Sequence, residues 1–353
     1  MFVLDSHCDT PSQILRLRDL SVDNEYSHVD FPKLKRGGVD GAFFALYVPA
    51  SLETDAAYAY YKRLLDAVRT VVRQNPAAVR LTVSELDARK NQSEGVFSMF
   101  LGLENGSPVG SRLERIHEFY DAGVRYMTLC HSRDNQICDS CASASGKWGG
   151  LSPFGKEVIA EMNHMGMLVD VSHISDAAFY DVLRCSKKPV VATHSCCRAL
   201  SEHPRNMTDD MIRALASEGG VIQINFYPLF LDATFSKVLS DSHIMDDGED
   251  IEQEFIKDPS DPDKRYAWND VQQALLGLQR PSFRKIADHI DHVVSLVGIE
   301  HVGLGSDYDG IEVTPEGMED ISMIPRIFDE LRFRGYSESD LAKIASENFF
   351  RIL

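Results

Sequence analysis

Residues that bind metals or move protons stand at the ends of several short apolar runs in this chain. The first run ends in His7 and Asp9, a second ends in Glu104, and two later runs end in His173 and His194. Several strands that each end in a possible ligand indicate that their ends converge on one place. Imidazole and carboxylate groups gathered in this way suit Zn²⁺. A neighbouring acid or base would make such a metal site a hydrolase.

His7 and Asp9 are separated by one residue. On a strand their side chains point to the same face, and Cys8 points to the other. The alternative is a buried hydrogen-bonded pair that orients a loop. Glu104 closes an apolar run, where a carboxylate is costly to bury without a cation. Its two oxygens could bridge two metals, although a helix-capping or exposed glutamate would also account for it.

His173 and His194 bring the set to five ligands. A single histidine at a strand end is more often a packing or loop residue than a ligand. Two of them on neighbouring strands, beside the His7–Asp9 pair and Glu104, favour a shared site. Five ligands fit two metals that share Glu104, with room left for a bridging water. Two metals lower the pKa of such a water and polarise a carbonyl, which is the chemistry needed to attack an amide.

The attack also needs a proton acceptor and groups that hold the substrate. Asp307 and Asp309 follow the last strand-like run with the same parity, so either could face inward, and we expect Asp309 to cap the following turn. His131 is either a sixth ligand or a donor to the developing oxyanion. Arg205 would hold a substrate carboxylate or form a surface ion pair. The remaining histidines, His28 among them, are interpreted as surface or packing residues.

Eight strand-like runs alternate with helix-like segments along the chain. The runs span residues 2–8, 40–48, 97–103, 125–130, 167–172, 189–194, 220–226 and 301–306. Alternation of this kind indicates a parallel sheet, and eight units predict a closed (β/α)₈ TIM barrel of the metal-dependent hydrolase type. Its active site would lie at the carboxyl ends of the strands, where the ligands fall. An open doubly wound sheet is the competing fold, but its site would draw on fewer strands.

Local signals also mark helix ends and an insertion. Ser152 begins one helix and Gly166 ends it, a second begins near Thr208, and the last begins near Ser337 or Ser339. The acidic, proline-broken stretch 236–281 is interpreted as a partly helical insertion after the seventh strand, close to the barrel mouth. The charged side chains of this stretch either lie on a solvated surface or are part of a lid over the site. Because no repeat or linker divides the chain, residues 1–353 are predicted to form one domain.

Composition excludes several partner classes. The chain has 36 Lys and Arg against 54 Asp and Glu, a formal net charge of -18. Nucleic acids and anionic membrane surfaces both bind to positively charged protein surfaces, so neither is an expected partner. No apolar run approaches the roughly 20 residues of a membrane span. The N-terminus lacks signal-peptide features and the seven cysteines are odd in number, so we expect a cytoplasmic protein.

Several motifs together resemble the membrane (renal) dipeptidase family of zinc metallopeptidases. The motifs span nearly the whole chain and are Asp-Ser-His-Cys-Asp-Thr-Pro at 5–11, Gly-Leu-Ser-Pro-Phe-Gly at 150–155, Val-Asp-Val-Ser-His at 169–173, Thr-His-Ser at 193–195, Pro-Arg-Asn at 204–206, Gly-Ser-Asp-Tyr-Asp-Gly at 305–310 and Glu-Asn-Phe-Phe-Arg at 347–351. The resemblance implies a (β/α)₈ barrel with two zinc ions per chain. By position, His7 and Asp9 would bind one zinc, His173 and His194 the other, and Glu104 would bridge them.

The same resemblance implies a dipeptidase mechanism. His131 would contact the substrate at the scissile carbonyl, Arg205 would hold its C-terminal carboxylate, and Asp307 would be the acid/base for a metal-bridging hydroxide that attacks the peptide bond. Relatives often accept a D-residue at the C-terminal position and often form dimers, so D-residue tolerance is expected and a homodimer is left open. The membrane part of the family name does not transfer, because no anchor signal is present.

Two other functions compete with this hypothesis. The first is another amide or lactam hydrolase that uses the same centre, such as an N-acyl-amino-acid or β-lactam hydrolase. Arg205 discriminates against substrates that lack a free carboxylate beside the scissile bond. The second is a catalytically silent barrel that binds metal for structure or acts as a scaffold. Such proteins usually lose a ligand or the acid/base, and this chain retains all of them.

Overall fold

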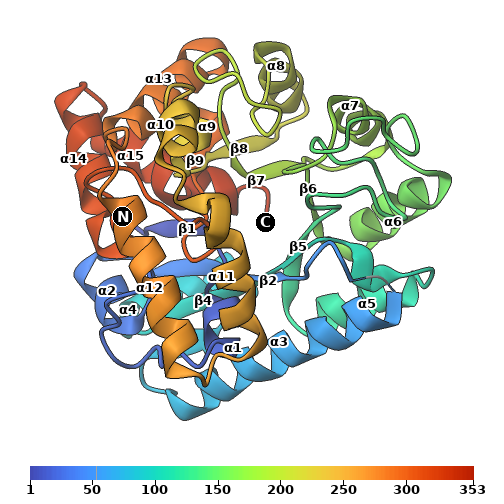
Figure 1. The fold of residues 1–353 in the computed structure, drawn as a ribbon. Coiled ribbons are helices and arrows are strands. Elements are labelled where there is room, and N and C mark those ends of the chain that lie inside the picture. Colours follow the sequence, from blue (N-terminus) through green and yellow to red (C-terminus); the bar gives the residue numbers. More distant parts are fainter. Residues whose placement is uncertain (53) are drawn as a thin grey trace.

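A ring of parallel strands forms the centre of the computed structural model, which describes residues 1–52 and 54–353 (Figure 1). The strands are β1 (Leu4–Cys8), β2 (Gly41–Tyr47), β3 (Val79–Leu81), β4 (Phe97–Glu104), β5 (Val124–Thr128), β6 (Leu168–Asp170), β7 (Val191–Ser195), β8 (Val221–Ile224) and β9 (Val302–Leu304). Eight of them pair in the order β1-β2-β4-β5-β6-β7-β8-β9, and every pairing is parallel. The result is a nearly closed (β/α)₈ barrel, as predicted.

The barrel closes at the carboxyl ends of its first and last strands. The backbone N–H of Asp9 donates to Tyr308 O over 2.8 Å, and the N–H of Asp307 donates to His7 O over 2.9 Å. These bonds join the end of β1 to the segment that follows β9. An open doubly wound sheet has two free edges, so this closure excludes the competing fold. Strand β3, which pairs only with β4, was not predicted, because three residues are too short to show a periodic pattern.

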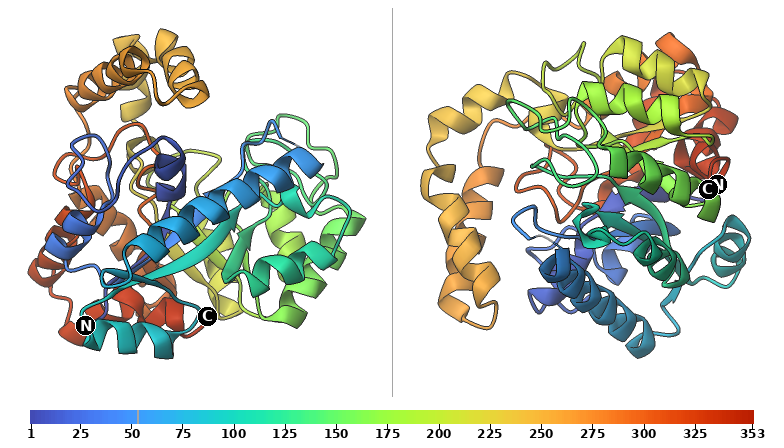
Figure 2. Two further views of the ribbon diagram at one scale, coloured as in Figure 1. Left: turned by 90° about the horizontal axis from the view of Figure 1, so that it is seen from below. Right: turned by 90° about the vertical axis from the view of Figure 1, so that its right-hand side faces the viewer.

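Helices follow the strands and cover the outside of the barrel (Figure 2). Before the insertion they are α1 (Thr10–Leu15), α2 (Phe31–Arg36), α3 (Thr54–Gln74), α4 (Glu85–Ser93), α5 (Glu114–Asp121), α6 (Pro153–Met165), α7 (Asp176–Cys185), α8 (Asp209–Ser217) and α9 (Pro228–Leu231). After it come α13 (Arg284–Val297), α14 (Pro325–Phe333), α15 (Glu338–Ala342) and α16 (Asn348–Phe350). None of the helices in the described part of the chain combines the length and apolar character that a membrane crossing requires.

The predicted helix ends are confirmed where capping residues fix them. The Ser152 hydroxyl accepts a hydrogen bond from the Gly155 N–H at the start of α6, and Gly166 ends that helix with a φ of 79°. Thr208 caps α8 in the same way. Ser337, one of the two predicted starts, begins α15 with a capping box, and the C-terminal helix then passes through a π-helical stretch, Lys343–Glu347, before α16. Local side-chain chemistry therefore sets these boundaries.

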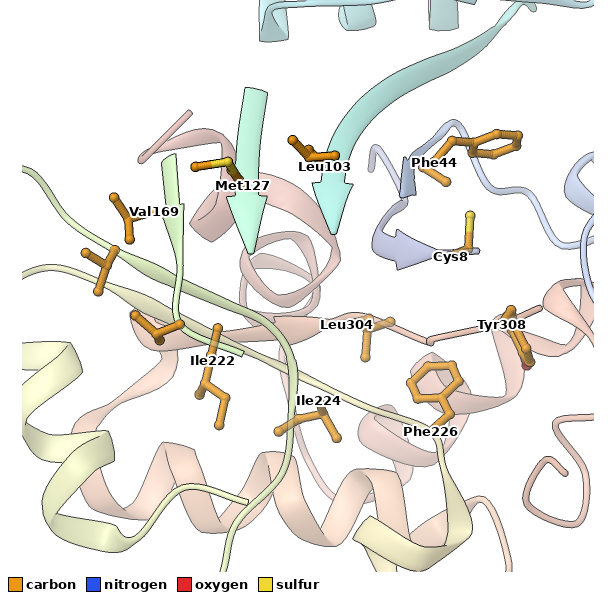
Figure 3. Close-up of a cluster of buried hydrophobic side chains, with 14 of the residues drawn as sticks. Cys8, Phe44, Leu103, Met127, Val169, Ile222, Ile224, Phe226, Leu304 and Tyr308 are labelled. Carbon is orange, nitrogen blue, oxygen red and sulfur yellow. The ribbon is translucent and has the colours of Figure 1, made fainter. Parts of the chain in front are cut away.

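Two apolar layers hold the barrel. The inner layer fills the barrel and is closed at its base by Phe349 and Phe350 from the C-terminal helix. It includes Phe43, whose ring stacks on Phe100 and makes a tilted contact with Tyr126. The outer layer lies between strands and helices and includes the residues labelled in Figure 3: Cys8, Phe44, Leu103, Met127, Val169, Ile222, Ile224, Phe226, Leu304 and Tyr308.

Strand β1 changes face part-way along its length. Leu4 belongs to the inner layer and Cys8 to the outer one, although two residues with a spacing of four would share a face on a regular strand. The register with β2 shifts between Asp5 and Cys8, as it does at a β-bulge or a similar irregularity. The irregularity turns Cys8 outward and directs its neighbour His7 to the barrel interior. Bulges commonly re-aim side chains next to active sites.

The insertion forms a helical cap after β8. It consists of α10 (Phe235–Ser242), α11 (Met245–Lys257) and α12 (Pro262–Leu276), and Figure 2 shows it projecting from one side of the barrel. A separate apolar cluster holds these helices together around Phe235, Phe255 and Trp268. Val313, from the segment after β9, packs into the same cluster and joins the cap to the barrel. The predicted insertion is therefore confirmed, with more helix than expected.

Candidate metal centre and substrate cavity

Glu104 ends β4 with its side chain inside the barrel. Phe100, Gly102 and Glu104 alternate along the strand, so all three face inward, while Leu101 and Leu103 face the outer layer. Glu104 is 2% exposed. Its position on a central strand places the carboxylate among the ends of several other strands, as the sequence pattern indicated.

The two carboxylate oxygens of Glu104 face two different groups of ligands. Oε2 lies 3.5 Å from Nε2 of His7, which is itself 3.6 Å from Oδ2 of Asp9. Oε1 lies 3.1 Å from Nε2 of His173 and 3.5 Å from Nε2 of His194. The Nε2 atoms of those two histidines are 2.9 Å apart. All five predicted metal ligands thus converge, in one group on each side of a single carboxylate.

The donor atoms in this cluster fit a metal. Nε2 of His7 and Oδ1 of Asp9 are buried and have no hydrogen-bond partner among the described residues. Buried polar atoms are normally paired, because leaving them unpaired costs free energy. His7, Glu104 and His194 offer ligand atoms within 4.8 Å of one another, and so do His7, Asp9 and Asp307. Nitrogen and carboxylate oxygen at this spacing are the ligand types of zinc sites.

The surroundings of the cluster shift the pKa values of its carboxylates and imidazoles. Burial raises the pKa of Asp9 to about 7, and the negative charge of Glu104 adds to that effect. Burial by itself would lower the pKa of His7, but the adjacent Glu104 and Asp9 carboxylates outweigh it and raise the pKa. Burial also lowers the pKa of His173 and of His194, which keeps these two imidazoles neutral. A cation bound among the carboxylates would offset the free-energy cost of burying their negative charge.

Residues behind the ligands fix the orientation of two imidazoles. The Tyr126 hydroxyl is 2.8 Å from Nδ1 of His7, on the ring edge opposite Nε2. The Thr193 hydroxyl donates to Asp170 over 2.7 Å, so its oxygen is left to accept from Nδ1 of His194 at 2.8 Å. That arrangement places the proton of His194 on Nδ1 and leaves the Nε2 lone pair toward the cluster. Such supporting bonds commonly orient metal-binding histidines.

No supporting role was predicted for Tyr126, Thr193 or Asp170, although each lies within a predicted strand. Gly102 was missed as well. A Cβ on Gly102 would lie inside van der Waals contact of the Tyr126 ring and hydroxyl, so glycine is what admits the tyrosine to the barrel interior. The alternation of a strand predicts which face each of these side chains occupies. It does not predict the residue that each contacts, because most of those residues lie on other strands.

His131 lies at the edge of the cluster. Its Nε2 is 3.8 Å from Oε1 of Glu104, and its ring centre is 4.2 Å from that of His173. Its Nδ1 is buried without a hydrogen-bond partner in the described residues. Burial lowers the pKa of His131 to about 4, and the nearby Arg205 acts in the same direction. The side chain is therefore a neutral donor or ligand in contact with the centre.

Arg205 presents unpaired N–H groups to the same cavity. Its Nη2 donates to the His194 backbone carbonyl over 3.1 Å, while Nε and Nη1 are buried with no partner in the described part of the chain. The guanidinium carbon lies 5.3 Å from the centre of the Phe230 ring. A buried guanidinium with free donors calls for an anion, and a carboxylate matches its planar geometry. The alternative of a surface ion pair does not fit these contacts.

Asp307 faces the ligands from the segment after β9. Its Oδ2 accepts a hydrogen bond from Asn225 over 2.8 Å, and its Oδ1 lies 3.9 Å from Nε2 of His7. Burial raises the pKa of Asp307, an effect that His7 opposes and Asp9 reinforces. Asp307 has a φ of 64° and His173 one of 71°, in the left-handed region that side-chain-bearing residues rarely adopt. Such conformations cost about 1–3 kcal/mol and cluster at functional sites.

Two sequence-based interpretations are wrong. Asp309 does not cap the following turn: its carboxylate accepts hydrogen bonds from the Thr10 hydroxyl over 2.7 Å and from the His28 N–H over 2.8 Å. His28 is not an ordinary surface or packing residue, because it lines the cavity beside Asp307. Its Nδ1 accepts from the Asp309 N–H over 2.9 Å. Both errors concern contacts between segments about 280 residues apart.

A cavity of about 400 Å³ opens above the cluster. Asp9, Glu104, His131, His173, Arg205 and Asp307 lie at its floor. Five residues of the cap also line it, namely Glu252, Gln253, Ile256, Trp268 and Gln272. Glu252 of α11 also forms an ion pair with Arg16 beside α1, with 3.0 Å between nitrogen and oxygen. The cap therefore forms a wall of the cavity, and the acidic insertion is not simply a solvated surface.

The family model described as membrane dipeptidase, peptidase family M19, matches residues 1–353. The chain belongs to this family. A dipeptidase of Aspergillus oryzae, aclJ, is 31% identical over 350 residues, which cover 97% of this chain and 73% of the relative. The family resemblance drawn from the motifs is thus confirmed, and the chain is a metallo-dipeptidase.

Solved structures show the same architecture. The probable dipeptidase PvdM from Pseudomonas aeruginosa is 27% identical and superposes with a TM-score of 0.84, covering 100% of this chain and 94% of that one. A metallo peptidase from Rhodobacter sphaeroides, liganded with a phosphinate mimic of the dipeptide L-Ala-D-Ala, is 23% identical with a TM-score of 0.81. The match covers 100% of this chain and 98% of the Rhodobacter chain, and it shows the shared fold.

Proposed function

We propose that this chain, acting as one catalytic domain, is a zinc-dependent dipeptidase with two zinc ions bridged by Glu104. The division of the two Glu104 oxygens between the His7 and His173–His194 groups is the observation that carries the proposal. His7 and Asp9 would hold one ion, and His173 and His194 the other. When bound, two such ions lower the pKa of a shared water and polarise the scissile carbonyl.

Substrate binding follows from the unpaired donors around the centre. The free Nε and Nη1 groups of Arg205 bind the C-terminal carboxylate of the dipeptide in a charge-assisted pair. This contact requires a free carboxylate next to the scissile bond and positions the carbonyl near His131. The neutral His131 imidazole donates to the carbonyl oxygen as negative charge develops there.

Proton transfer falls to Asp307. Its Oδ2 is held by Asn225, which leaves Oδ1 free on the side that faces the ligands. Oδ1 accepts a proton from the water that attacks the carbonyl carbon and then gives it to the leaving amine. A carboxylate with a raised pKa is suited to this exchange, because it gains and loses a proton more readily near neutral pH.

A dipeptide panel with metal analysis tests this function. Purified protein reconstituted with zinc should contain two ions per chain and hydrolyse L-Ala-L-Ala, while L-Ala-L-Ala-amide, which lacks the free carboxylate, should be a poor substrate. L-Ala-D-Ala tests the expected tolerance of a D-residue. Efficient turnover of N-acetyl-L-Ala or of a β-lactam, with no turnover of dipeptides, would favour the competing amide or lactam hydrolase. One ion per chain in a fully active enzyme would contradict the bridging role of Glu104.

A further inference from the structure

The cavity contains a carboxylate that the proposed mechanism does not use. Glu312 lines the cavity from the segment that follows β9. No lysine, arginine or histidine of the described residues forms an ion pair with it, whereas its cavity neighbour Glu252 is paired with Arg16. An acid left without a cation in a partly enclosed cavity is costly unless a ligand supplies the positive charge.

A hydrogen-bond donor and a further acceptor lie near Glu312. The Tyr227 hydroxyl faces the Glu312 carboxylate. On the cap, Gln272 lines the same cavity, and its Oε1 atom is buried with no hydrogen-bond partner in the described part of the chain. Val313 packs against Trp268 and Val271 of α12, so the helix that carries Gln272 approaches the chain beside Glu312. A carboxylate without a cationic partner and an unpaired amide oxygen, both lining one cavity, indicate a ligand rich in donors.

The aromatic wall of the cavity relates Glu312 to the substrate. The Arg205 guanidinium lies against the Phe230 ring, and the Phe230 ring centre is 5.0 Å from that of Tyr227. The Tyr227 hydroxyl then faces Glu312. Glu312 also lies close enough to Asp307 for the two negative charges to affect each other. Arg205 and Asp307, the proposed anchors of the carboxylate and the amide nitrogen of the C-terminal residue, therefore line the same cavity as Glu312.

We propose that Glu312, with Gln272, forms a subsite for a cationic side chain on the C-terminal residue of the dipeptide. This inference rests on the proposed function, because the pose of the substrate comes from Arg205 and Asp307. The enzyme would select dipeptides that end in lysine or arginine over those that end in alanine. The same subsite disfavours a C-terminal glutamate, because the two carboxylates repel each other in the cavity.

The test compares kcat/KM for L-Ala-L-Lys, L-Ala-L-Ala, L-Ala-L-Glu and L-Lys-L-Ala in the zinc-loaded full-length enzyme. Wild type should prefer L-Ala-L-Lys to L-Ala-L-Ala by about tenfold, the size expected for one hydrogen-bonded charge pair in a hydrated cavity. Glu312→Gln should bring this ratio close to one. Glu312→Lys should shift the preference toward L-Ala-L-Glu. Glu316→Gln is the matched control, because this exposed glutamate lies on the same segment outside the cavity, and it should keep the wild-type ratio.

The possible outcomes distinguish failure of the proposed subsite from failure of the proposed dipeptidase function. If wild type hydrolyses L-Ala-L-Ala but shows no preference for L-Ala-L-Lys, the subsite is wrong and the dipeptidase proposal stands. If Glu312→Gln slows all four dipeptides by the same factor, Glu312 contacts the common α-ammonium group instead, which overturns the subsite. A preference for L-Lys-L-Ala that Glu312→Gln abolishes would place the cation on the other residue and also overturn it. An enzyme that hydrolyses none of the four overturns both proposals.

Discussion

Replacing Tyr126 with phenylalanine is the sharpest test of how the barrel interior supports the metal centre. The substitution removes one hydroxyl and keeps the ring, which packs against Phe43 in the inner layer. The lost contact is the 2.8 Å hydrogen bond to Nδ1 of His7. Nδ1 then has only the Thr193 hydroxyl at 3.4 Å, a long and weak replacement.

The expected effect follows from that geometry. Leaving a buried donor poorly paired costs about 1–3 kcal/mol, and loss of a hydrogen bond that orients a metal-binding histidine commonly lowers metal affinity by about 10–100-fold. Because each factor of ten corresponds to about 1.4 kcal/mol, the two ranges agree. The Thr193 contact recovers part of the loss, so we expect Tyr126→Phe to weaken binding of one zinc ion by about tenfold.

A chelator competition measures this effect directly. Zinc occupancy would be followed at rising concentrations of a competing chelator, with metal content read by mass spectrometry, in parallel with dipeptide turnover at saturating zinc. One of the two ions should leave the variant at about a tenfold lower chelator concentration. The other ion, held by His173 and His194, should respond less, because Tyr126 does not contact those residues.

Tyr180→Phe is the matched control, since this tyrosine lies on α7 at the surface and is 36% exposed. It should leave zinc occupancy unchanged. If Tyr126→Phe also retains both ions as tightly as wild type and keeps full turnover, the hydroxyl does not orient His7, and the support inferred for this ligand is wrong. Equal loss of both ions would instead indicate a general loosening of the barrel.

The remaining predictions address other parts of the same site. Asp307→Asn should retain both metals and lose at least about a hundredfold in kcat, as expected for a missing acid/base, and full activity with normal zinc content would exclude the proton transfer. Arg205→Lys should raise KM for dipeptides by about tenfold or more because the bidentate fork is lost, and an unchanged KM would remove the carboxylate-binding role. Gly102→Ala should lower the free energy of unfolding by about 1–3 kcal/mol, since the new methyl overlaps the Tyr126 ring, and a thermal denaturation curve identical to wild type would contradict this packing. Removal of metal by dialysis against a chelator should abolish turnover and lower Tm, because buried carboxylates and imidazoles lose their shared cation, and readdition of zinc should restore both; turnover that persists in metal-free protein would refute the metal-dependent mechanism.

Many structural elements of this protein can be predicted from short stretches of its sequence. Apolar runs of six to nine residues, with glycine, serine and threonine at the helix ends between them, identified all eight barrel strands and several helix boundaries, because these signals act over a few residues. The candidate ligands His7, Glu104, His173 and His194 were recognisable because each stands at the end of such a run. Once the runs are strands of one barrel, their carboxyl ends must meet.

The tertiary structure alone decided how those residues act together. The irregularity in β1, which directs His7 inward, appears only when β1 is paired with β2. The bond from Tyr126 to His7 joins residues 119 positions apart, and the cavity is lined both by Glu312 of the segment after β9 and by Gln272 of the cap. Sequence periodicity reports which face of a strand or helix a side chain occupies. It carries no information about the partner across the barrel, because that partner is chosen by chain closure and by the packing of distant segments.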